Sequence, residues 1–299
     1  MNVFQAIVLG VIQGLTEFLP VSSTGHLRVL PALFGWEDPG APFTAVIQLG
    51  TTLAVLIYFR KDLWNAVTGW IKGLRGGEAA KTTDARMGWA IIIGTIPIII
   101  FGFTFKDQIE NQLRSLYVVA WTLIAMSGVM LAADQMGKKK RGLTSVKWLD
   151  GLWVGLWQCI ALIPGASRSG STITGALFAG FDRSTAARFS FLLSVPAITA
   201  AAIFAMREHS SMLVDPAMAT NIWVANIVSF FAGYAAIAFL ISFLQRHSLL
   251  VFIVYRVLLG ILLLVLLQIG FLTPFQGMPV EDAPPPPPSV VQPMSPPPQ

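Results

Sequence analysis

The segment that decides the fold lies near the start of the chain, where residues 10–26 read GVIQGLTEFLPVSSTGH. An apolar run is interrupted there by Gln13 and Glu17, which are four residues apart and so share one face of a helix. Pro20 then breaks the helix, and three hydroxyl side chains and His26 follow within nine residues of the glutamate. Because an ionisable group inside an apolar segment is costly unless it is paired or wetted, Glu17 indicates a functional site. The alternative is a glutamate that only stabilises a turn.

A second polar cluster follows another proline in the second half of the chain, where residues 164–172 read PGASRSGST. Glycines free the backbone to turn, and successive backbone N–H groups at a helix N-terminus can bind an anion. The hydroxyl groups add hydrogen-bond donors, and Arg168 adds a permanently charged planar group that matches phosphate oxygens. Together these residues predict an oxyanion or phosphate site. The alternative is a serine-rich helix cap with an arginine that extends to the membrane interface.

The two clusters are related by a short internal repeat. In the first copy, Pro20 follows Gln13 after seven residues. In the second copy, 145 residues later, Pro164 follows Gln158 after six, so one residue must be gapped to align the two. Hydroxyl side chains follow both prolines. Two short helices, each broken by proline, predict a pair of re-entrant helix-loop-helix hairpins in an inverted-topology repeat. We expect the hairpins to enter the membrane from opposite sides and their tips to meet near its middle.

The composition is that of an all-α polytopic membrane protein. Of the 299 residues, 55% are hydrophobic and only 12% are charged, against about 25% in soluble domains. The mean hydropathy is +0.68. These values exclude a soluble enzyme, a DNA-binding module and a secreted disulfide scaffold. Besides the two hairpins we expect about six transmembrane helices of the usual 17–25 residues, over residues 43–59, 87–105, 116–133, 185–206, 222–244 and 249–272.

The basic residues predict the orientation in the membrane. The loop 60–86 carries six basic and three acidic residues, and the loop 138–147 carries five basic and no acidic residues. Because two spans separate these loops, both can face the cytoplasm, in agreement with the positive-inside rule. The net charge of +5 is therefore explained without a nucleic-acid partner.

We expect a single membrane domain over residues 1–272, with one repeat over about 1–134 and the other over about 148–272. Residues 273–299 are expected to form a proline-rich, disordered tail. Ten of the nineteen prolines lie in residues 277–299, a composition that cannot form a packed core.

If the hairpin tips meet, one site holds the Glu17 carboxylate, the His26 imidazole, the Arg168 guanidinium and several hydroxyl groups. This set suits phosphoryl transfer, which requires neutralised charge on the phosphate oxygens and an aligned nucleophile. With one carboxylate nearby, a divalent cation would be held jointly by Glu17 and the substrate phosphates. Gln48, inside an apolar span, is assigned to a hydrogen bond between helices.

The two clusters resemble the signature motifs of the bacterial undecaprenyl-diphosphate phosphatase family, also named for bacitracin resistance. The segment from Gln13 to His26 is similar to its Glu/Gln-x-x-x-Glu motif and the Ser-Ser-Thr-Gly-His that follows, and the segment from Pro164 to Thr172 to its Pro-Gly-x-Ser-Arg-Ser-x-x-Thr motif. The similarity in length, hydropathy and motif spacing covers roughly residues 1–272. Gln13 is the variant allowed at the first motif position, which argues against a mechanism in which two carboxylates hold a metal.

The resemblance implies a hydrolase that removes the terminal phosphate of undecaprenyl diphosphate and so recycles the lipid carrier for peptidoglycan and cell-wall synthesis. It also implies an interdigitated inverted repeat of six spanning helices and two re-entrant hairpins in the bacterial inner membrane. The site is expected to open toward the periplasm and to need a divalent cation, Mg²⁺ or Ca²⁺. Undecaprenyl diphosphate and membrane lipids are the expected partners, and a homodimer is a further expectation.

Carried over by position, the expected catalytic residues are Glu17, Ser23, His26 and Arg168. Glu17 is also the expected metal ligand, shared with the substrate phosphates. The expected substrate-binding residues are Gln13, Ser22, Thr24, Gly165, Ser167, Ser169 and Thr172.

Two alternatives stay open from the sequence. The attacking group is either Ser23 or a water beside it, with Glu17 accepting the proton and His26 either protonating the leaving group or opening a phosphoserine intermediate. A rival function is a lipid-phosphate transporter or flippase, because inverted repeats with broken helices are typical of transporters and the same cluster would bind the head group.

Overall fold

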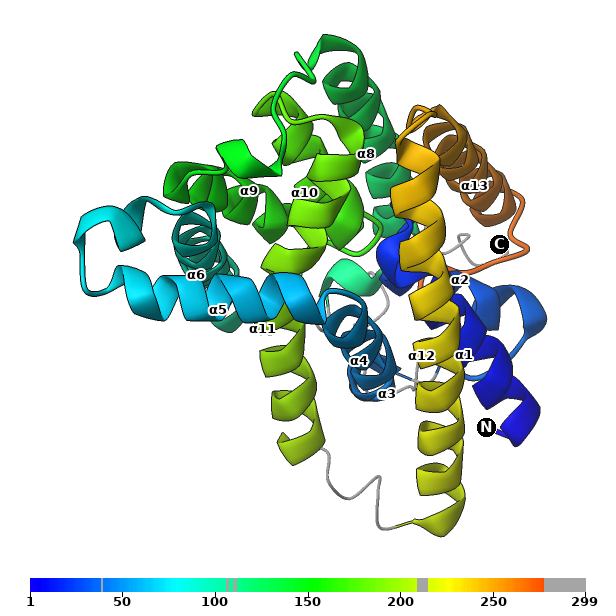
Figure 1. The fold of residues 1–299 in the computed structure, drawn as a ribbon. Coiled ribbons are helices and arrows are strands. Elements are labelled where there is room, and N and C mark those ends of the chain that lie inside the picture. Colours follow the sequence, from blue (N-terminus) through cyan, green and yellow to red (C-terminus); the bar gives the residue numbers. More distant parts are fainter. Residues whose placement is uncertain (39, 106–107, 110–111, 209–214, 277–299) are drawn as a thin grey trace, which may run out of the picture.

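The computed structural model describes residues 1–38, 40–105, 108–109, 112–208 and 215–276. These residues form a bundle of helices, with one isolated β-bridge between Arg141 and Phe181 (Figure 1). The helices, including the 3₁₀ helices η1–η3, are α1 Val3–Phe18, α2 Ser23–Phe34, α3 Gly40–Val46, α4 Gln48–Tyr58, α5 Arg60–Gly73, η1 Gly77–Lys81, α6 Thr83–Thr104, η2 Gln112–Arg114, α8 Leu116–Met136, η3 Leu143–Ser145, α9 Trp148–Ile160, α10 Arg168–Phe178, α11 Arg183–Glu208, α12 Pro216–Leu244 and α13 Leu250–Gln268.

The described helices confirm an all-α, multi-pass membrane protein. Five of them, α6, α8, α11, α12 and α13, are long and apolar enough to cross a membrane. The expected span over residues 43–59 corresponds to the helix over Pro42–Tyr58, which α5 follows after a bend of 75°. A sixth span is present if this bent pair crosses as one unit.

The expected loop over residues 60–86 is wrong in its first half, where the chain forms the amphipathic helix α5. Trp64, Val67 and Ile71 are spaced three and four residues apart and leave one exposed apolar face, while the charged residues lie in the first and last turns of the helix. These charged residues hide the spacing. A helix with one exposed apolar face and basic residues at its ends is suited to lie in the membrane interface.

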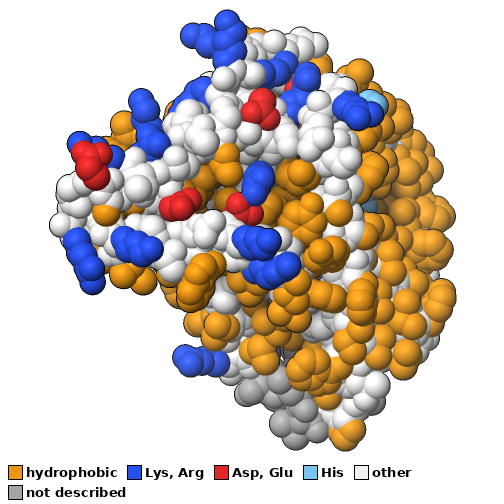
Figure 2. Space-filling view, viewed as in Figure 1, with side chains coloured by type: hydrophobic (Ala, Val, Ile, Leu, Met, Phe, Trp, Pro, Cys, Tyr) orange, Lys and Arg blue, Asp and Glu red, His pale blue; other side chains and the backbone are white. Residues whose placement is uncertain are grey.

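The two basic loops lie at the same end of the molecule. Arg86 Nη2 donates a hydrogen bond of 3.1 Å to the carbonyl oxygen of Thr144 and so joins the loop 60–86 to the loop 138–147. Figure 2 shows basic side chains gathered over this end and a broad apolar surface over the side formed by α12 and α13. This contact places the two loops together, which supports their location on one side of the membrane; the orientation in the membrane stays a prediction.

The packing of the two halves corresponds. The first short helix of each half, α1 or α9, packs along a long helix of the other half, α12 or α6 respectively (Figure 1). Small residues allow both approaches, because a Cβ at Gly10 would lie 2.7 Å from the Ala225 carbonyl oxygen and one at Gly155 would lie 2.2 Å from that of Gly94. The inverted repeat and the re-entry of the hairpins stay predictions, which this correspondence supports.

The start of the expected tail packs against the membrane domain. The Leu116 N–H donates a hydrogen bond of 2.9 Å to the Pro274 carbonyl oxygen, and Arg28 donates to the carbonyl oxygen of Gln276. Residues 273–276 thus contact the membrane domain, and the division of the chain at residue 272 stays a prediction. The rest of that tail, residues 277–299, lies outside the described residues.

The close contact between α9 and α6 predicts that Gly155→Ala lowers stability, whereas Gly128→Ala on α8 does not. The added methyl group at position 155 overlaps the α6 backbone, which costs about 1–3 kcal/mol, while nothing lies within 4 Å of a Cβ at position 128. The apparent Tm of the two purified variants in detergent checks this difference. An unchanged Tm for Gly155→Ala would contradict the packing described.

Candidate functional site

Two turns of matching geometry form the centre of the molecule, one between α1 and α2 and the other between α9 and α10. Ser22 and Ser167 cap the helices that follow, accepting hydrogen bonds from the N–H groups of Gly25 at 3.3 Å and Gly170 at 3.1 Å. Both serines have a positive φ, 77° and 72°, which side-chain-bearing residues rarely adopt. Such strained conformations persist where the surrounding structure imposes them, and they are common at functional sites.

Arg256, in the middle of α13, holds both turns together. Its guanidinium group is fully buried and donates to the carbonyl oxygens of Pro20 at 3.2 Å, Gly165 at 3.0 Å and Ala166 at 3.1 Å. Its Nε also donates to Ser127 Oγ at 3.2 Å. One side chain thus joins the two turns, which are more than 140 residues apart, and pairs carbonyl groups that helix breaks leave without partners.

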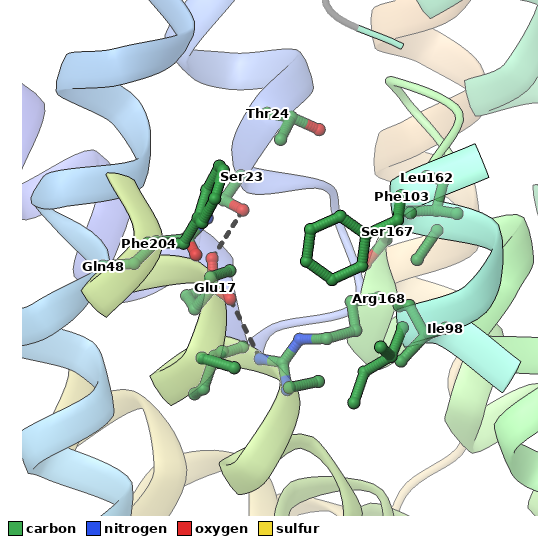
Figure 3. Close-up of a pocket in the computed structure, with 17 residues that line it drawn as sticks. Glu17, Ser23, Thr24, Gln48, Ile98, Phe103, Leu162, Ser167, Arg168 and Phe204 are labelled. Carbon is green, nitrogen blue, oxygen red and sulfur yellow. Dashed lines mark hydrogen bonds and ion pairs between the residues drawn. The ribbon is translucent and has the colours of Figure 1, made fainter. Parts of the chain in front are cut away.

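Glu17 is the centre of the polar cluster that the two turns form. One carboxylate oxygen accepts a hydrogen bond of 2.7 Å from Ser23 Oγ and one of 3.0 Å from Gln13 Nε2. The other oxygen accepts a bond of 2.9 Å from Arg168 Nη2, across 151 residues of sequence (Figure 3). The structure therefore brings together the two polar clusters of the sequence, as expected if the hairpin tips meet.

The cluster faces a cavity of about 350 Å³ between the two turns and the helices α6 and α11. Polar side chains line one part of it, those of Glu17, Ser23, Thr24, Gln48, Ser167 and Arg168. The rest of the wall is apolar and includes Ile98 and Phe103 of α6 and Phe204 of α11 (Figure 3). A ligand with a small charged head and a hydrocarbon tail matches this division.

Arg168 retains hydrogen-bonding capacity beside the cavity. Its side chain is only 12% exposed, and its Nε and Nη1 have no hydrogen-bond partner in the described structure. Unpaired buried donors are costly, and a guanidinium group matches the geometry of phosphate oxygens. Arg168 can therefore bind Glu17 and a phosphate group at the same time.

The expected site residues divide into two groups. Those that line the cavity are Glu17, Ser23, Thr24, Ser167 and Arg168. The other expected residues, besides His26, are absent from the lining and support the turns: Gln13, Ser22, Gly165, Ser169 and Thr172.

Two examples show how the second group acts. Ser169 Oγ donates to the Leu19 carbonyl oxygen at 3.1 Å, which ties one turn directly to the other. Thr172 Oγ1 donates to the Arg168 carbonyl oxygen at 2.7 Å and contacts the hydroxyl group of Ser190. Because both side chains are buried and engaged in these hydrogen bonds, they hold the turns in place, and their expected role in substrate binding stays a prediction.

His26 is turned toward α13 and does not line the cavity. Its Nδ1 lies 2.7 Å from the Ser22 carbonyl oxygen, which can only accept, so this nitrogen carries a proton. Its Nε2 lies 2.6 Å from the Tyr255 hydroxyl group, and the two rings stack with centroids 5.6 Å apart. In this geometry His26 holds the carbonyl group of the strained Ser22 turn.

The place of three residues in this region was not predicted from the sequence. Arg256 lies inside an apolar segment, so the cost of an embedded charge was the signal that could have found it. Tyr255 gave no signal, because its pairing with His26 spans 229 residues. Gln48 was assigned to helix packing but lines the cavity beside Thr24.

The described residues contain no group of three or more His, Cys, Asp or Glu side chains that could hold a metal ion. Glu17 offers carboxylate oxygens, and the buried amide oxygen of Gln13 has no hydrogen-bond partner. Both are oxygen ligands of the kind that Mg²⁺ and Ca²⁺ accept. A divalent cation therefore fits here if the phosphate oxygens of a substrate complete its coordination.

Comparison with known proteins gives consistent matches along the chain. The model of the family described as Bacitracin resistance protein BacA matches residues 6–262. A protein of Myxococcus xanthus named undecaprenyl-diphosphatase is 51% identical over 278 residues, 93% of each chain. Proteins of the same name from Chlorobaculum tepidum and Prosthecochloris aestuarii are 49% and 50% identical, over 92% and 90% of this chain and 100% and 99% of their own.

The position of Arg256 predicts that Arg256→Met destabilises the protein by at least about 3 kcal/mol, because three buried carbonyl groups lose their donor. Arg256→Lys keeps the charge and is expected to restore part of the loss. Apparent Tm in detergent measures both effects, with Arg246→Met at an exposed position as the matched control. A wild-type Tm for Arg256→Met would show that the turns do not depend on this side chain.

Proposed function

Because the chain belongs to the Bacitracin resistance protein BacA family, we propose that it hydrolyses undecaprenyl diphosphate to undecaprenyl phosphate and inorganic phosphate. Three relatives that match it over at least 90% of its length carry the name undecaprenyl-diphosphatase. This reaction regenerates the phosphorylated lipid carrier for cell-wall synthesis and explains the link to bacitracin resistance in the family description. The protein is thus a membrane-embedded phosphatase.

One observation supports the cavity at Glu17 as the site of this reaction. The carboxylate of Glu17 is bound on one side by a hydroxyl group, that of Ser23 at 2.7 Å, and on the other by a guanidinium group, that of Arg168 at 2.9 Å. Base, nucleophile and oxyanion-binding group are the three parts that phosphoryl transfer requires.

Ser23 is the nucleophile that this geometry favours, because its hydroxyl group already donates to the carboxylate. Ser23 Oγ forms a bond to the terminal phosphorus atom, and the bond from phosphorus to the bridging oxygen breaks. The proton of Ser23 passes to Glu17, and undecaprenyl phosphate leaves with the bridging oxygen and its electron pair. A water molecule then attacks the phosphoserine, inorganic phosphate is released, and Ser23 recovers its proton.

Arg168 and His26 have different parts in this scheme. The unpaired Nε and Nη1 of Arg168 bind oxygens of the diphosphate and offset the charge that develops during transfer. His26 acts as a positioning residue, since its contacts hold the Ser22 turn that presents Ser23 to the base.

The Glu17 carboxylate and the Gln13 amide oxygen would be the protein ligands of a divalent cation, Mg²⁺ or Ca²⁺, bound together with the diphosphate. When bound, it would neutralise part of the negative charge of the two phosphate groups. The binding of Glu17 to Ser23 and Arg168 prepares the site before the substrate and its cation arrive.

The apolar wall of the cavity supports a lipid substrate. Side chains of α6 and α11 form this wall, among them Ile98, Phe103 and Phe204 (Figure 3), and Phe103 and Phe204 are themselves 67% and 44% exposed at the surface of the bundle. The first isoprene units of the lipid would lie against them. The diphosphate head is thereby held at the turns while most of the chain stays in the bilayer.

The charge distribution supports a location in the bacterial inner membrane with the two basic loops in the cytoplasm. The site then opens toward the periplasm, on the side opposite these loops. The homodimer stays a prediction. The transporter alternative is not favoured, because the relatives are named as phosphatases and because a hydroxyl group bound to a carboxylate serves hydrolysis rather than binding.

We expect Glu17→Gln to lower kcat for phosphate release by about a hundredfold to ten-thousandfold, because the variant lacks the base that accepts the Ser23 proton. Release of phosphate from undecaprenyl diphosphate or a shorter prenyl diphosphate by purified protein measures this. Glu78→Gln, at an exposed position on η1, is the matched control. Full hydrolysis by Glu17→Gln would exclude the proposed site, and full lipid transport without hydrolysis by the native protein would favour the alternative function.

Ser23→Ala is expected to abolish a covalent phosphoenzyme that forms in the native protein. Acid quenching after mixing with a prenyl diphosphate labelled with ³²P on the terminal phosphate traps this species, which is detected on a denaturing gel. Ser242→Ala, at an exposed position on α12, is the matched control. A fully active Ser23→Ala variant would eliminate Ser23 as the nucleophile in favour of water.

A further inference from the structure

A second cavity, of about 230 Å³, lies beside the first. It is also lined by Thr44 and by two arginines, Arg28 of α2 and Arg114 of η2. The side chains and backbone that the two cavities share form a common wall, made by Thr24, Gln48, Ala161 and Leu162. The second cavity therefore adjoins the first across these shared residues. Its wall is largely apolar, and Arg28 and Arg114 supply its charged groups.

Positive charge exceeds negative charge around this second cavity among the described residues. The Asp38 carboxylate faces both arginines, with Arg114 Nη2 at 2.7 Å and Arg28 Nε at 3.6 Å from the same oxygen. The side chains of Asp38, Arg28 and Arg114 are only 2%, 4% and 15% exposed. One carboxylate does not neutralise two guanidinium groups, so this cluster of largely buried side chains retains a surplus positive charge.

Arg28 also retains unused hydrogen-bond donors. Its Nη1 donates to the Gln276 carbonyl oxygen, but its Nε and Nη2 have no hydrogen-bond partner in the described structure. Leaving a charged donor buried and unpaired is costly, so the arrangement points to a ligand that supplies acceptors. A tetrahedral oxyanion supplies several acceptors and matches the planar guanidinium group.

The proposed reaction releases such an anion, inorganic phosphate, in the first cavity, which adjoins the second. Inorganic phosphate is doubly or singly charged at neutral pH and cannot leave along the apolar wall that receives the lipid, because transfer of a charge into hydrocarbon is prohibitive. The lipid product and the phosphate therefore require separate routes. The second cavity shares Thr24 and Gln48 with the first and contains two arginines that can bind an anion, which makes it the candidate route for phosphate.

We propose that Arg28 and Arg114 form a subsite that binds the product, inorganic phosphate, after its release from the cluster at Glu17 and on its way out of the protein. This inference rests on the proposed function. Asp38 limits the affinity, because its carboxylate offsets one of the two positive charges and repels the anion. A route must bind the ion strongly enough to receive it and weakly enough to release it, as in other anion pathways.

Product inhibition by inorganic phosphate tests the subsite. Initial rates of hydrolysis of a prenyl diphosphate are measured in phospholipid-free detergent at increasing inorganic phosphate, with the native protein, Arg114→Gln and Arg246→Gln. Arg246→Gln is the control, because it removes one exposed positive charge that does not line the cavity. We expect the inhibition constant for phosphate to rise about tenfold in Arg114→Gln, the effect of one lost charge-assisted hydrogen bond, and to be unchanged in Arg246→Gln.

Arg114→Lys, which keeps the charge, is expected to lie between the native protein and Arg114→Gln. Equal inhibition of the native protein and Arg114→Gln would overturn the subsite while leaving the proposed function intact, since hydrolysis itself is tested at Glu17. A parallel measurement in vesicles with phosphatidylglycerol identifies the source of the ligand. If Arg114→Gln changes activation by this lipid but not inhibition by phosphate, the cluster binds a lipid head group and the proposal is wrong.

Discussion

The arrangement of the protein depends on a single buried cation. Arg256 lies in an apolar helix, where an unpaired guanidinium group would be prohibitively costly. The turns at Pro20 and at Gly165 lack hydrogen-bond donors, because each helix break leaves carbonyl groups without partners. The hydrogen bonds from Arg256 resolve both costs at once and thereby hold the two turns at a defined separation. The turn at Pro20 is therefore satisfied only by a side chain from the other half of the chain.

The consequence for the site is that its charged groups meet only in the complete fold. Glu17 comes from the first half and Arg168 from the second, and their contact of 2.9 Å lies between turns that Arg256 and Ser169 tie together. In these largely apolar surroundings, electrostatic interactions are stronger than in water. An apolar wall lies beside this cluster, and a second cavity that contains Arg28 and Arg114 adjoins it.

The sequence predicted those residues whose presence in an apolar chain is costly. Glu17 and Arg168 stood out for that reason, and the proline breaks with their hydroxyl groups located both turns. Contacts between distant segments could not be read in this way, so the partner of His26 and the role of Gln48 emerged only from the structure. The helix over Arg60–Gly73 was missed because its charge density concealed a regular apolar spacing.

The central claim is that Glu17 and Arg168 act on one substrate in one site. A double-mutant cycle tests it most directly, with kcat/KM for a prenyl diphosphate measured in the native protein, Glu17→Gln, Arg168→Lys and the combined variant. Residues in contact that serve one transition state are strongly non-additive. We therefore expect the combined variant to be about as slow as the slower single variant. Losses that multiply as independent effects would contradict the account.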